Sequence, residues 1–554
     1  MQKRVWTPIQ IRYNLPIALT AIDSLGATHG ISGRPITIDP LSDASLLQMQ
    51  RWMAECTSNH KGTCQPDSEH TLPTRVIDVY GNSSHDAFLH ISEGQKGRWL
   101  ILSHVWGNKA GYVTDAKNLN AMKTSIPEDK LPKTFQNAIA VTRRLGFQYL
   151  WIDSLCILQG ETEDWAAEVV HMHEYYKHSS LMIAADAANG DHCGFLQPRP
   201  PKYPSIVVPF NFEHKAENHS VFVQRQPPSR KDLWPLFTRG WTLQEDVLSP
   251  RTVHFQTHQM TWECQTHKFE ELKPYKVDSL KRALLGSSPN SWLSTVGEFS
   301  NRDLTFKEDM LPALSAIAKE YQSTSQQTYK AGLWLEDMHR CLLWTPRWRG
   351  KRTRQPSWSW ASLDVPRKSI RTPTFRVELI KHLPQRQSGK LAGEISEVID
   401  CVVVPEDGDS YGRIQSGSLR MRGPWKEAAE WSGFTPYINP DNGDDGPRNS
   451  SLECRREFDP FGQNERSPGD PTQLVCTLDE DPTDFLESSE AVLQHLSLFQ
   501  ILNIRYPEGD VIIALILQSV REEEGTFRRR GIAQVPIVHG HAEVGWKTRE
   551  VRII

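Results

Sequence analysis

Three short apolar segments separated by two helical patterns constrain the fold more than any other feature of this sequence. The segments are residues 99–106, 149–153 and 181–185. Each is a run of aliphatic and aromatic residues, which is typical of a strand with both faces buried. Strands that alternate with helices pair in parallel through right-handed crossovers. The sequence therefore predicts an α/β domain built on a parallel sheet with flanking helices.

The two helical patterns carry their own start and end signals. Thr134 is placed to cap the first helix and Gly146 to end it, and Asp164 is placed to cap the second. The apolar residues at helical spacing are Phe135, Ala138, Ile139, Thr142 and Leu145 in the first helix, and Trp165, Val169, Met172 and Tyr176 in the second. Each helix therefore has a face suited to packing against the sheet.

Further elements are expected beyond residue 200. Residues 206–208 and 221–223 are predicted strands, and a helix is expected between Arg239 and Pro250. Residues 253–255 and 260–262 are expected to form a hairpin that closes the domain.

These patterns divide the chain into four regions. We expect an N-terminal extension at 1–75, the α/β domain at 76–275 with its core motifs at 98–250, a helical linker segment at 276–365 that includes 329–344, and a β-rich C-terminal region at 366–554. The stretch at about 436–474 is rich in Pro, Asn, Asp and Gly, and is predicted to be a disordered or exposed loop.

Charge, hydropathy and cysteine usage limit the setting in which the chain works. A net charge of −4 gives no basic field for binding nucleic acid. The longest purely apolar run, residues 511–517, is far shorter than the roughly 20 residues that span a bilayer. Nine scattered cysteines do not form a disulfide framework, and the N-terminus lacks a signal peptide. We therefore expect a cytoplasmic protein without a membrane span.

Three of the cysteine and histidine side chains have a spacing that bears on metal binding. Cys56, His60 and Cys64 form a Cys-x3-His-x3-Cys pattern that offers three soft ligands. Tetrahedral zinc requires four, and no fourth ligand is identifiable from the sequence. The alternative is a helix end and loop with ordinary cysteines. We therefore predict no metal site.

The α/β region resembles the fungal heterokaryon incompatibility (HET) domain, because several short motifs occur in that family's order. The motifs are Leu102-Ser-His-Val-Trp-Gly107, Thr134-Phe-Gln-Asn-Ala-Ile139, Leu150-Trp-Ile-Asp-Ser-Leu-Cys-Ile157 with Gln159, Asp164-Trp165 with Glu168 and Met172, and Arg239-Gly-Trp-Thr-Leu-Gln-Glu245. Leu72-Pro-Thr-Arg75, Leu333-Trp334 and Ser357-Trp-Ser-Trp-Ala361 extend the resemblance to the flanks. His104 and Leu158 depart from the family's usual residues.

The resemblance implies a role in fungal non-self recognition and in the programmed cell death that follows hyphal fusion. The HET domain has also been likened to the Toll/interleukin-1 receptor (TIR) domain, which implies a TIR/flavodoxin-like parallel sheet. Some TIR domains cleave NAD, so NAD is a candidate substrate and the chain a candidate NAD glycohydrolase. No bound cofactor is expected.

This likeness to TIR domains points to a set of candidate site residues. Glu245 follows Trp241 in a Trp-x-x-x-Glu string and is the candidate catalytic residue. The candidate substrate-binding residues are Ser103, Trp106, Gly107, Asp153 and Trp241. Ligands of doubly wound sheets bind at the carboxyl ends of the strands, where we expect Ser103, Asp153 and Glu245 to lie.

Each of these candidates has a structural alternative. Glu245 near a helix N-terminus is favourable without catalysis, and Trp241 can fill the core. Asp153 is either a ligand-facing acid or a cap for the following loop. Glu168 is the rival carboxylate, although an inter-helix pair is the simpler role for it. Cys156 between apolar neighbours is typical of a buried small side chain rather than a nucleophile.

Two other functions remain open. The chain is either a non-catalytic signalling or recognition module that docks partners, or an accessory protein of another pathway such as a secondary-metabolite cluster. In all three cases a protein partner or self-association is expected, because the chain contains no nucleotide-binding loop and no repeat sensor.

Overall fold

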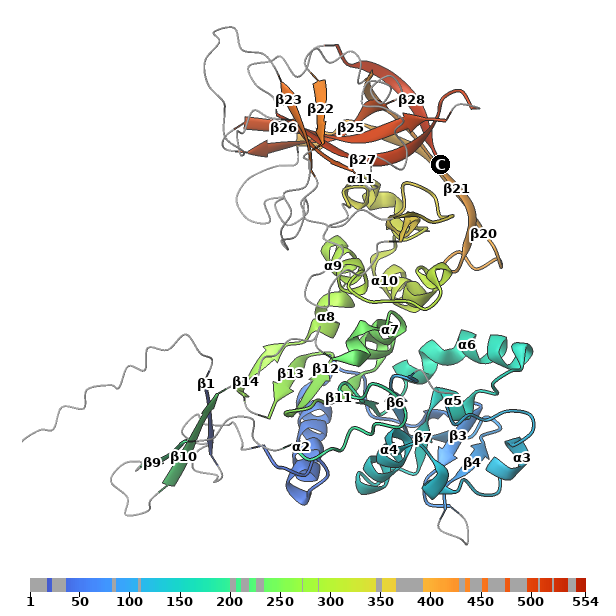
Figure 1. Cartoon of the computed structure of the whole chain (residues 1–554), viewed down its shortest axis with the longest axis vertical. Helices are drawn as coiled ribbons and strands as arrows, with labels where there is room; N and C mark the ends of the chain where they lie inside the picture. The colour runs from blue at the N-terminus through green and yellow to red at the C-terminus, as the bar shows by residue number, and fades with distance from the viewer. Residues whose placement is uncertain are drawn as a thin grey trace, which may run out of the picture. The chain divides into compact units, whose positions relative to one another are not determined.

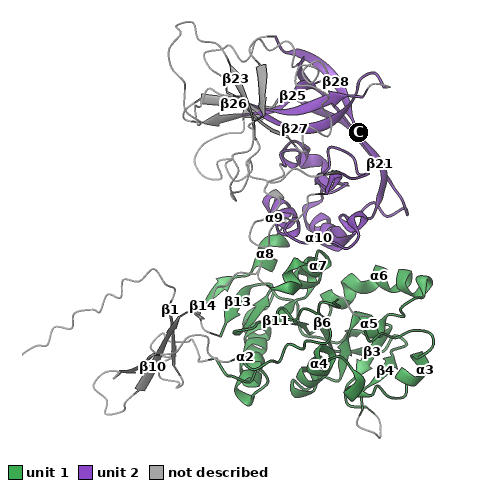
Figure 2. Cartoon of the chain, in the orientation of Figure 1, with its two compact units in different colours: residues 1–284 green, residues 285–554 purple. Residues whose placement is uncertain are grey.

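The computed structural model divides the chain into two compact units, Met1–Leu284 and Leu285–Ile554 (Figure 2). It describes residues 17–21, 36–81, 86–107, 111–199, 206–210, 219–225, 234–271, 273–286, 288–344, 351–364, 392–427, 434–438, 451–456, 474–478, 496–506, 509–520, 523–536 and 545–554.

A nine-stranded sheet forms the centre of the first unit (Figure 1). Its strands are β3 (Arg75–Asp78), β4 (Phe88–Ile91), β6 (Trp99–Ser103), β7 (Tyr149–Trp151), β8 (Leu181–Ala184), β11 (Arg251–Phe255), β12 (Met260–Cys264), β13 (His267–Glu270) and β14 (Lys273–Asp278). They lie in the order β14-β13-β12-β11-β8-β6-β7-β3-β4. The three predicted apolar strands are therefore adjacent at the centre of the sheet.

The sheet is mixed, which corrects the prediction of a parallel sheet. Strands β7, β6, β8 and β11 pair in parallel. Strands β3 and β4 on one side, and β12 to β14 on the other, pair antiparallel. The hairpin predicted at 253–255 and 260–262 is confirmed as β11 and β12. Strands joined by a short turn can only pair antiparallel, whereas parallel pairing requires a long crossover.

Helices make the crossovers between the parallel strands. Helix α4 (Lys133–Arg144) joins β6 to β7, α6 (Thr162–Lys177) lies between β7 and β8, and α7 (Trp241–Leu248) precedes β11. Most of the predicted core face of α4 is confirmed, because Phe135, Ala138, Ile139 and Thr142 are buried and Leu145 is half-buried. The predicted face of α6 was largely wrong, because Tyr176 is buried but Trp165 is exposed. Gly146 has a φ of 80°, as expected for a residue that ends a helix in the left-handed region.

The two predicted helix caps were wrong. Pro132 is the N-cap of α4, and Thr134 instead donates to Gly190 O at 3.2 Å and accepts from Gly194 N at 3.1 Å. Glu161 is the N-cap of α6. Asp164 in its first turn accepts from Leu158 N at 2.9 Å and pairs with Arg75 at 2.6 Å. Both side chains use partners from other elements, which local sequence does not reveal.

Two further pieces of the first unit lie outside the central parallel strands. Helix α2 (Asp43–Asn59) packs on β12, where the Trp52 and Trp262 ring centroids are 6.4 Å apart. The predicted strands at 206–208 and 221–223 are β9 (Ile206–Phe210) and β10 (His219–Arg225). With β1 (Ile17–Ala21) they form a separate three-stranded sheet rather than part of the main one.

The second unit begins with a helical part whose core is rich in tryptophan. Its main helices are α9 (Pro289–Phe299), α10 (Ser315–Ser325) and α11 (Met338–Cys341). The fully buried tryptophans here are Trp292, Trp334, Trp344, Trp358 and Trp360. The segment 329–344, predicted as helical, starts as a hairpin of β15 (Tyr329–Lys330) and β16 (Leu333–Trp334). Ala331 and Gly332 at the turn have φ values of 47° and 90°, which a helix does not allow.

The C-terminal part of the second unit is a ten-stranded sheet, as its alternating pattern predicts. Strands β21 (Ile414–Glu427), β25 (Leu496–Tyr506), β26 (Gly509–Ser519), β27 (Thr526–Pro536) and β28 (Lys547–Ile553) pair in a closed ring. The other strands are β19 (Ala392–Glu394), β20 (Glu397–Pro405), β22 (Phe434–Ile438), β23 (Ser451–Arg456) and β24 (Leu474–Leu478).

The predicted loop at about 436–474 contains part of this sheet. Strand β23 falls within it and β22 overlaps its start; the two strands pair with each other, and β23 also pairs with β24. These strands were not predicted because the stretch has a polar composition. The remainder of that stretch, residues 439–450 and 457–473, lies outside the described residues.

Candidate functional site

A hydrogen bond joins two residues that are 142 positions apart at the carboxyl end of the central strands. Ser103 is the last residue of β6, and its Oγ donates to Glu245 Oε2 over 2.5 Å. Glu245 lies on α7, which is part of the crossover between β8 and β11. Because β8 is the sheet neighbour of β6, this crossover brings α7 over the end of β6.

Polar and charged groups of the protein surround the Glu245 carboxyl group. Part of the residue remains exposed, but burial raises the pKa of its carboxyl group. Hydrogen bonds from Ser103 and Tyr176 and the charge of Arg239 act in the opposite direction, whereas the charge of Asp153 adds to the increase. The pKa of buried Tyr176 is raised well above its usual value, by burial first and then by the charge of Glu245. Three donors or cations therefore face one carboxyl group.

Asp153 and Trp106 form a second pair beside the first. Trp106 Nε1 donates to Asp153 Oδ2 at 2.8 Å, and Ser154 N donates to Asp153 Oδ1 at 2.7 Å. Asp153 begins the short helix α5 (Asp153–Cys156) directly after β7. The cap alternative for Asp153 therefore has a counterpart, since one oxygen accepts from its local backbone and the other from the loop after β6. The ligand-facing role stays a prediction.

Gly107 allows the loop after β6 to approach the loop after β8. Its φ is 85°, and a Cβ atom there would lie 3.2 Å from Gly190 Cα. An L-residue at this position is disfavoured by both its backbone angle and its contact.

We therefore expect Gly107→Ala to lower the free energy of unfolding by about 1–3 kcal/mol. Chemical denaturation of the full chain measures this. Gly297→Ala is the matched control, because nothing lies within 4 Å of a Cβ there and its φ is not positive. Equal stability of the two variants would contradict the proposed constraint.

Trp241 is a candidate residue whose side chain makes no described contact with Ser103, Asp153 or Glu245. It is half-buried and begins α7, one turn before Glu245, so the two side chains lie on the same side of the helix. Within the described residues, no hydrogen bond or ring contact joins its indole to Ser103, Asp153 or Glu245.

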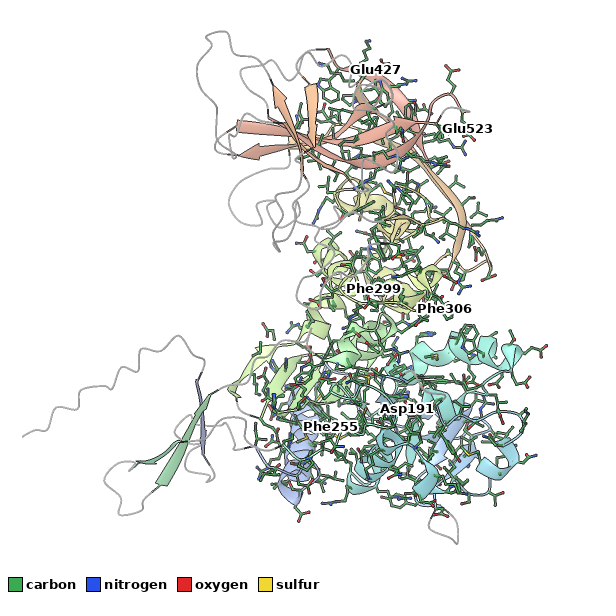
Figure 3. All side chains as sticks on the ribbon, in the orientation of Figure 1. Asp191, Phe255, Phe299, Phe306, Glu427 and Glu523 are labelled. Carbon is green, nitrogen blue, oxygen red and sulfur yellow. The ribbon has the colours of Figure 1, made fainter. Side chains whose placement is uncertain are left out.

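The sequence analysis missed four residues of this neighbourhood. Tyr176 and Arg239 contact Glu245 as described, and Arg239 Nη1 also donates to His104 O at 2.8 Å. Buried His104 lies between two acids, with its Nε2 3.2 Å from Asp191 Oδ1 and its Nδ1 3.9 Å from Asp153 Oδ1. Asp191 is labelled in Figure 3 and follows β8. Arg239 and His104 could have been identified from their position in the sequence, because both lie inside motifs that also contain candidate site residues.

The rival residues have structural roles. Glu168 is buried, accepts from Tyr175 Oη at 2.9 Å and lies 3.5 Å from Arg75 Nη2. Cys156 is fully buried, which raises the pKa of its thiol to about 12 and leaves it protonated at neutral pH. Neither side chain contacts Glu245 or Ser103 in a described interaction.

The domain belongs to the α/β class. It has a mixed sheet with crossover helices, and polar residues gather at the carboxyl ends of its parallel strands. Residues 99–245 match the family model described as heterokaryon incompatibility protein (HET). The chain therefore contains a HET domain, and the matched segment, from the first residue of β6 to Glu245, includes all six candidate residues. No curated protein and no solved structure matches the chain. Among the described residues, no helix is both long enough and apolar enough to cross a membrane.

Proposed function

We propose that this protein acts in fungal non-self recognition and programmed cell death by hydrolysing NAD at Glu245. The observation that carries the proposal is the hydrogen bond of 2.5 Å between Ser103 and Glu245, at the carboxyl ends of the parallel strands. The bond supports the proposal because the Glu245 carboxylate contacts the first residue of the loop that leads to Trp106 and Gly107.

The order of the parallel strands supports a TIR/flavodoxin-like core. In chain order β6, β7, β8 and β11 are the first to fourth parallel strands, and in the sheet they lie as β7-β6-β8-β11. This is the order 2-1-3-4 with which flavodoxin-like sheets begin. In such sheets ligands bind outside the carboxyl ends where the strand order reverses, between the first and third strands. Ser103 ends the first of these strands.

The chemistry of NAD hydrolysis requires only one carboxylate of this kind. Nicotinamide leaves a cationic N-glycoside as a neutral molecule, so no general acid has to protonate it, in contrast to ordinary glycosides. Water attacks C1 of the ribose as the bond to nicotinamide breaks, giving ADP-ribose, nicotinamide and a proton. The Glu245 carboxylate stabilises the oxocarbenium-like charge and accepts from ribose hydroxyls. Trp106 offers a flat surface for the nicotinamide ring or a base.

Self-association is the expected trigger, and α6 offers a surface for it. Trp165, Val169 and Met172 recur at helical spacing, and Trp165 is 51% exposed. A row of apolar side chains that stays exposed on a folded helix favours contact with another protein. The same observation supports the alternative function, a non-catalytic module that only docks partners.

In the test, the purified full chain is incubated with NAD at dilute and at crowded protein concentrations, and the nicotinamide release is compared. Nicotinamide release that rises with concentration supports catalysis after self-association. Trp165→Ser should then reduce that concentration dependence by on the order of tenfold, about the loss of one buried aromatic contact. Glu163→Gln, an exposed neighbour on α6, is the control. An absence of release in every oligomeric state would leave the docking module as the function.

A further inference from the structure

Four side chains with the chemistry of zinc ligands meet in the first unit, away from Glu245. Cys56, His60, Cys64 and Cys264 are all buried, and their ligand atoms lie within 4.8 Å of one another. His60 Nδ1 is 3.4 Å from Cys264 Sγ and 3.8 Å from Cys64 Sγ. The first three form the Cys-x3-His-x3-Cys pattern in the sequence, for which no metal site was predicted because a fourth ligand was missing. Cys264 supplies the missing fourth, 200 residues after Cys64.

Local structure brings the first three ligands to one point. Cys56 lies in the last turn of α2 and His60 is the C-cap, so the i, i+4 spacing places them on the same face. The chain then makes a tight turn in which Cys64 N and Thr63 N both donate to His60 O. This turn returns Cys64 to the end of the helix. Cys264 ends β12, the strand on which α2 packs (Figure 1).

Two of the distances between ligand atoms are close to those around a tetrahedral zinc ion. With Zn–S bonds of about 2.3 Å and Zn–N bonds of about 2.0 Å, neighbouring ligand atoms lie about 3.5–3.8 Å apart. The distances from His60 Nδ1 to Cys264 Sγ and to Cys64 Sγ, 3.4 and 3.8 Å, fall near this interval. Three cysteines and one histidine complete the coordination shell, which leaves no open position for a substrate. The set therefore fits a structural metal rather than a catalytic one.

The surroundings of the cluster also fit a bound metal. A zinc ion with three thiolates and one imidazole carries a net charge of −1, which requires a nearby cation inside a protein. Arg251 is fully buried and pairs in register with Cys264 on the neighbouring strand, so both side chains point to the same face of the sheet. Its guanidinium donates to Gln65 O and Ser180 O, and among the described residues it forms no ion pair with a carboxylate.

Other groups are placed to support thiolate ligands. His267 N lies 3.4 Å from Cys264 Sγ, and Thr266 Oγ1 lies 3.1 Å from Cys64 Sγ. Donors around ligating sulfur atoms orient the ligands and tune the metal.

We propose that Cys56, His60, Cys64 and Cys264 bind one structural zinc ion that fastens helix α2 to strand β12. Because the ion joins residues about 200 positions apart, it closes a long loop and stabilises the unit that contains the HET domain. The inference does not depend on NAD hydrolysis.

Metal analysis of the full chain tests this proposal. The protein is purified without chelators, and its zinc content is measured by mass spectrometry of the metal. We expect one zinc per chain, near-complete loss of zinc in Cys264→Ala, and a melting temperature lower by on the order of 10 °C in that variant. Cys156→Ala is the matched control, because Cys156 is a buried cysteine of the same unit outside the cluster and its replacement should leave the zinc content unchanged.

Two further measurements keep the test decisive if Cys264→Ala does not fold. Cys264→His substitutes another zinc ligand and should retain the metal. Cobalt(II) added to metal-free wild type should give the visible absorption of a tetrahedral site with thiolate ligands. Wild type without zinc, zinc retained in folded Cys264→Ala, or a disulfide linking two of these cysteines in the native protein would overturn the proposal.

Discussion

Glu245→Gln is expected to lower NAD hydrolysis by on the order of 10²–10³-fold or more, the cost of removing one group that stabilises charge in the transition state. Glutamine keeps the size of the side chain and can still accept from Ser103, so the local packing survives. It cannot supply the negative charge that the developing oxocarbenium ion requires. The measurement is nicotinamide release by the full chain under the conditions where wild type is active.

A matched carboxylate controls for the change of charge. Glu174 on α6 has a side chain that is 43% exposed and pairs with His178, away from Ser103. Glu174→Gln should therefore leave turnover within a factor of about two, as a surface substitution does. Full turnover in Glu245→Gln, with an unchanged circular dichroism spectrum, would remove Glu245 from the mechanism.

The direction of the pH dependence of activity and stability can be predicted for wild type and Glu245→Gln. Burial raises the pKa of Glu245 above its usual value of 4.5, and activity requires the ionised form. The acid limb of activity should therefore lie above pH 4.5. Stability changes in the opposite sense, because the folded state holds a proton that the unfolded state has released between the two pKa values. As pH rises through this window, wild type should lose stability relative to Glu245→Gln.

The sequence predicted the central strands well because their burial is continuous and local. Residues 99–103, 149–151 and 181–184 are apolar over their whole length, so no partner had to be known to recognise them. The direction of the flanking strands depended on the length of each connection. That information is weak in a single sequence, and the sheet proved to be mixed.

The errors at the helix caps and at the cysteine cluster share one physical cause, which is that the polar side chains bind partners distant in the sequence. Thr134 and Asp164 have the chemistry of N-caps, but they bond to Gly190 and Arg75. Cys264 completes a set of ligands that begins 208 positions earlier, at Cys56. The pairing of Ser103 with Glu245 was predictable only because the HET motifs fixed where both residues lie relative to strand ends. Tyr176, which no motif singled out for the site, could not be found in this way.

Lys281→Ala is expected to lower the free energy of unfolding of the first unit by about 3–5 kcal/mol, the usual cost of removing one partner from a buried ion pair. Lys281 is 1% exposed, and its Nζ lies 3.1 Å from Asp246 Oδ1. It also donates to Ser249 O at 2.8 Å and to Thr252 Oγ1 at 2.6 Å. The substitution leaves the Asp246 carboxylate buried without this ammonium group.

The buried network around Lys281 holds the helix that carries Glu245. Asp246 is the next residue on α7, and its Oδ1 is 3.8 Å from His254 Nε2, whose Nδ1 is 3.1 Å from Asp186 Oδ1. Thermal and denaturant unfolding of the full chain measure the loss, with Arg282→Ala, an exposed neighbour on α8 (Leu280–Leu284), as the matched control.

A double variant separates the ion pair from simple packing. The double variant Lys281→Met, Asp246→Asn should lose less unfolding free energy than the sum of the two single variants. Each single change leaves one unpaired buried charge, whereas the double change leaves none. Additive costs would mean that the two groups do not interact. Since Lys281 lies beyond residue 275, where the sequence analysis placed the end of the α/β domain, a large effect here would also mean that the domain needs α8. The carboxylate at 245 would then be positioned by a residue that the HET motifs do not include.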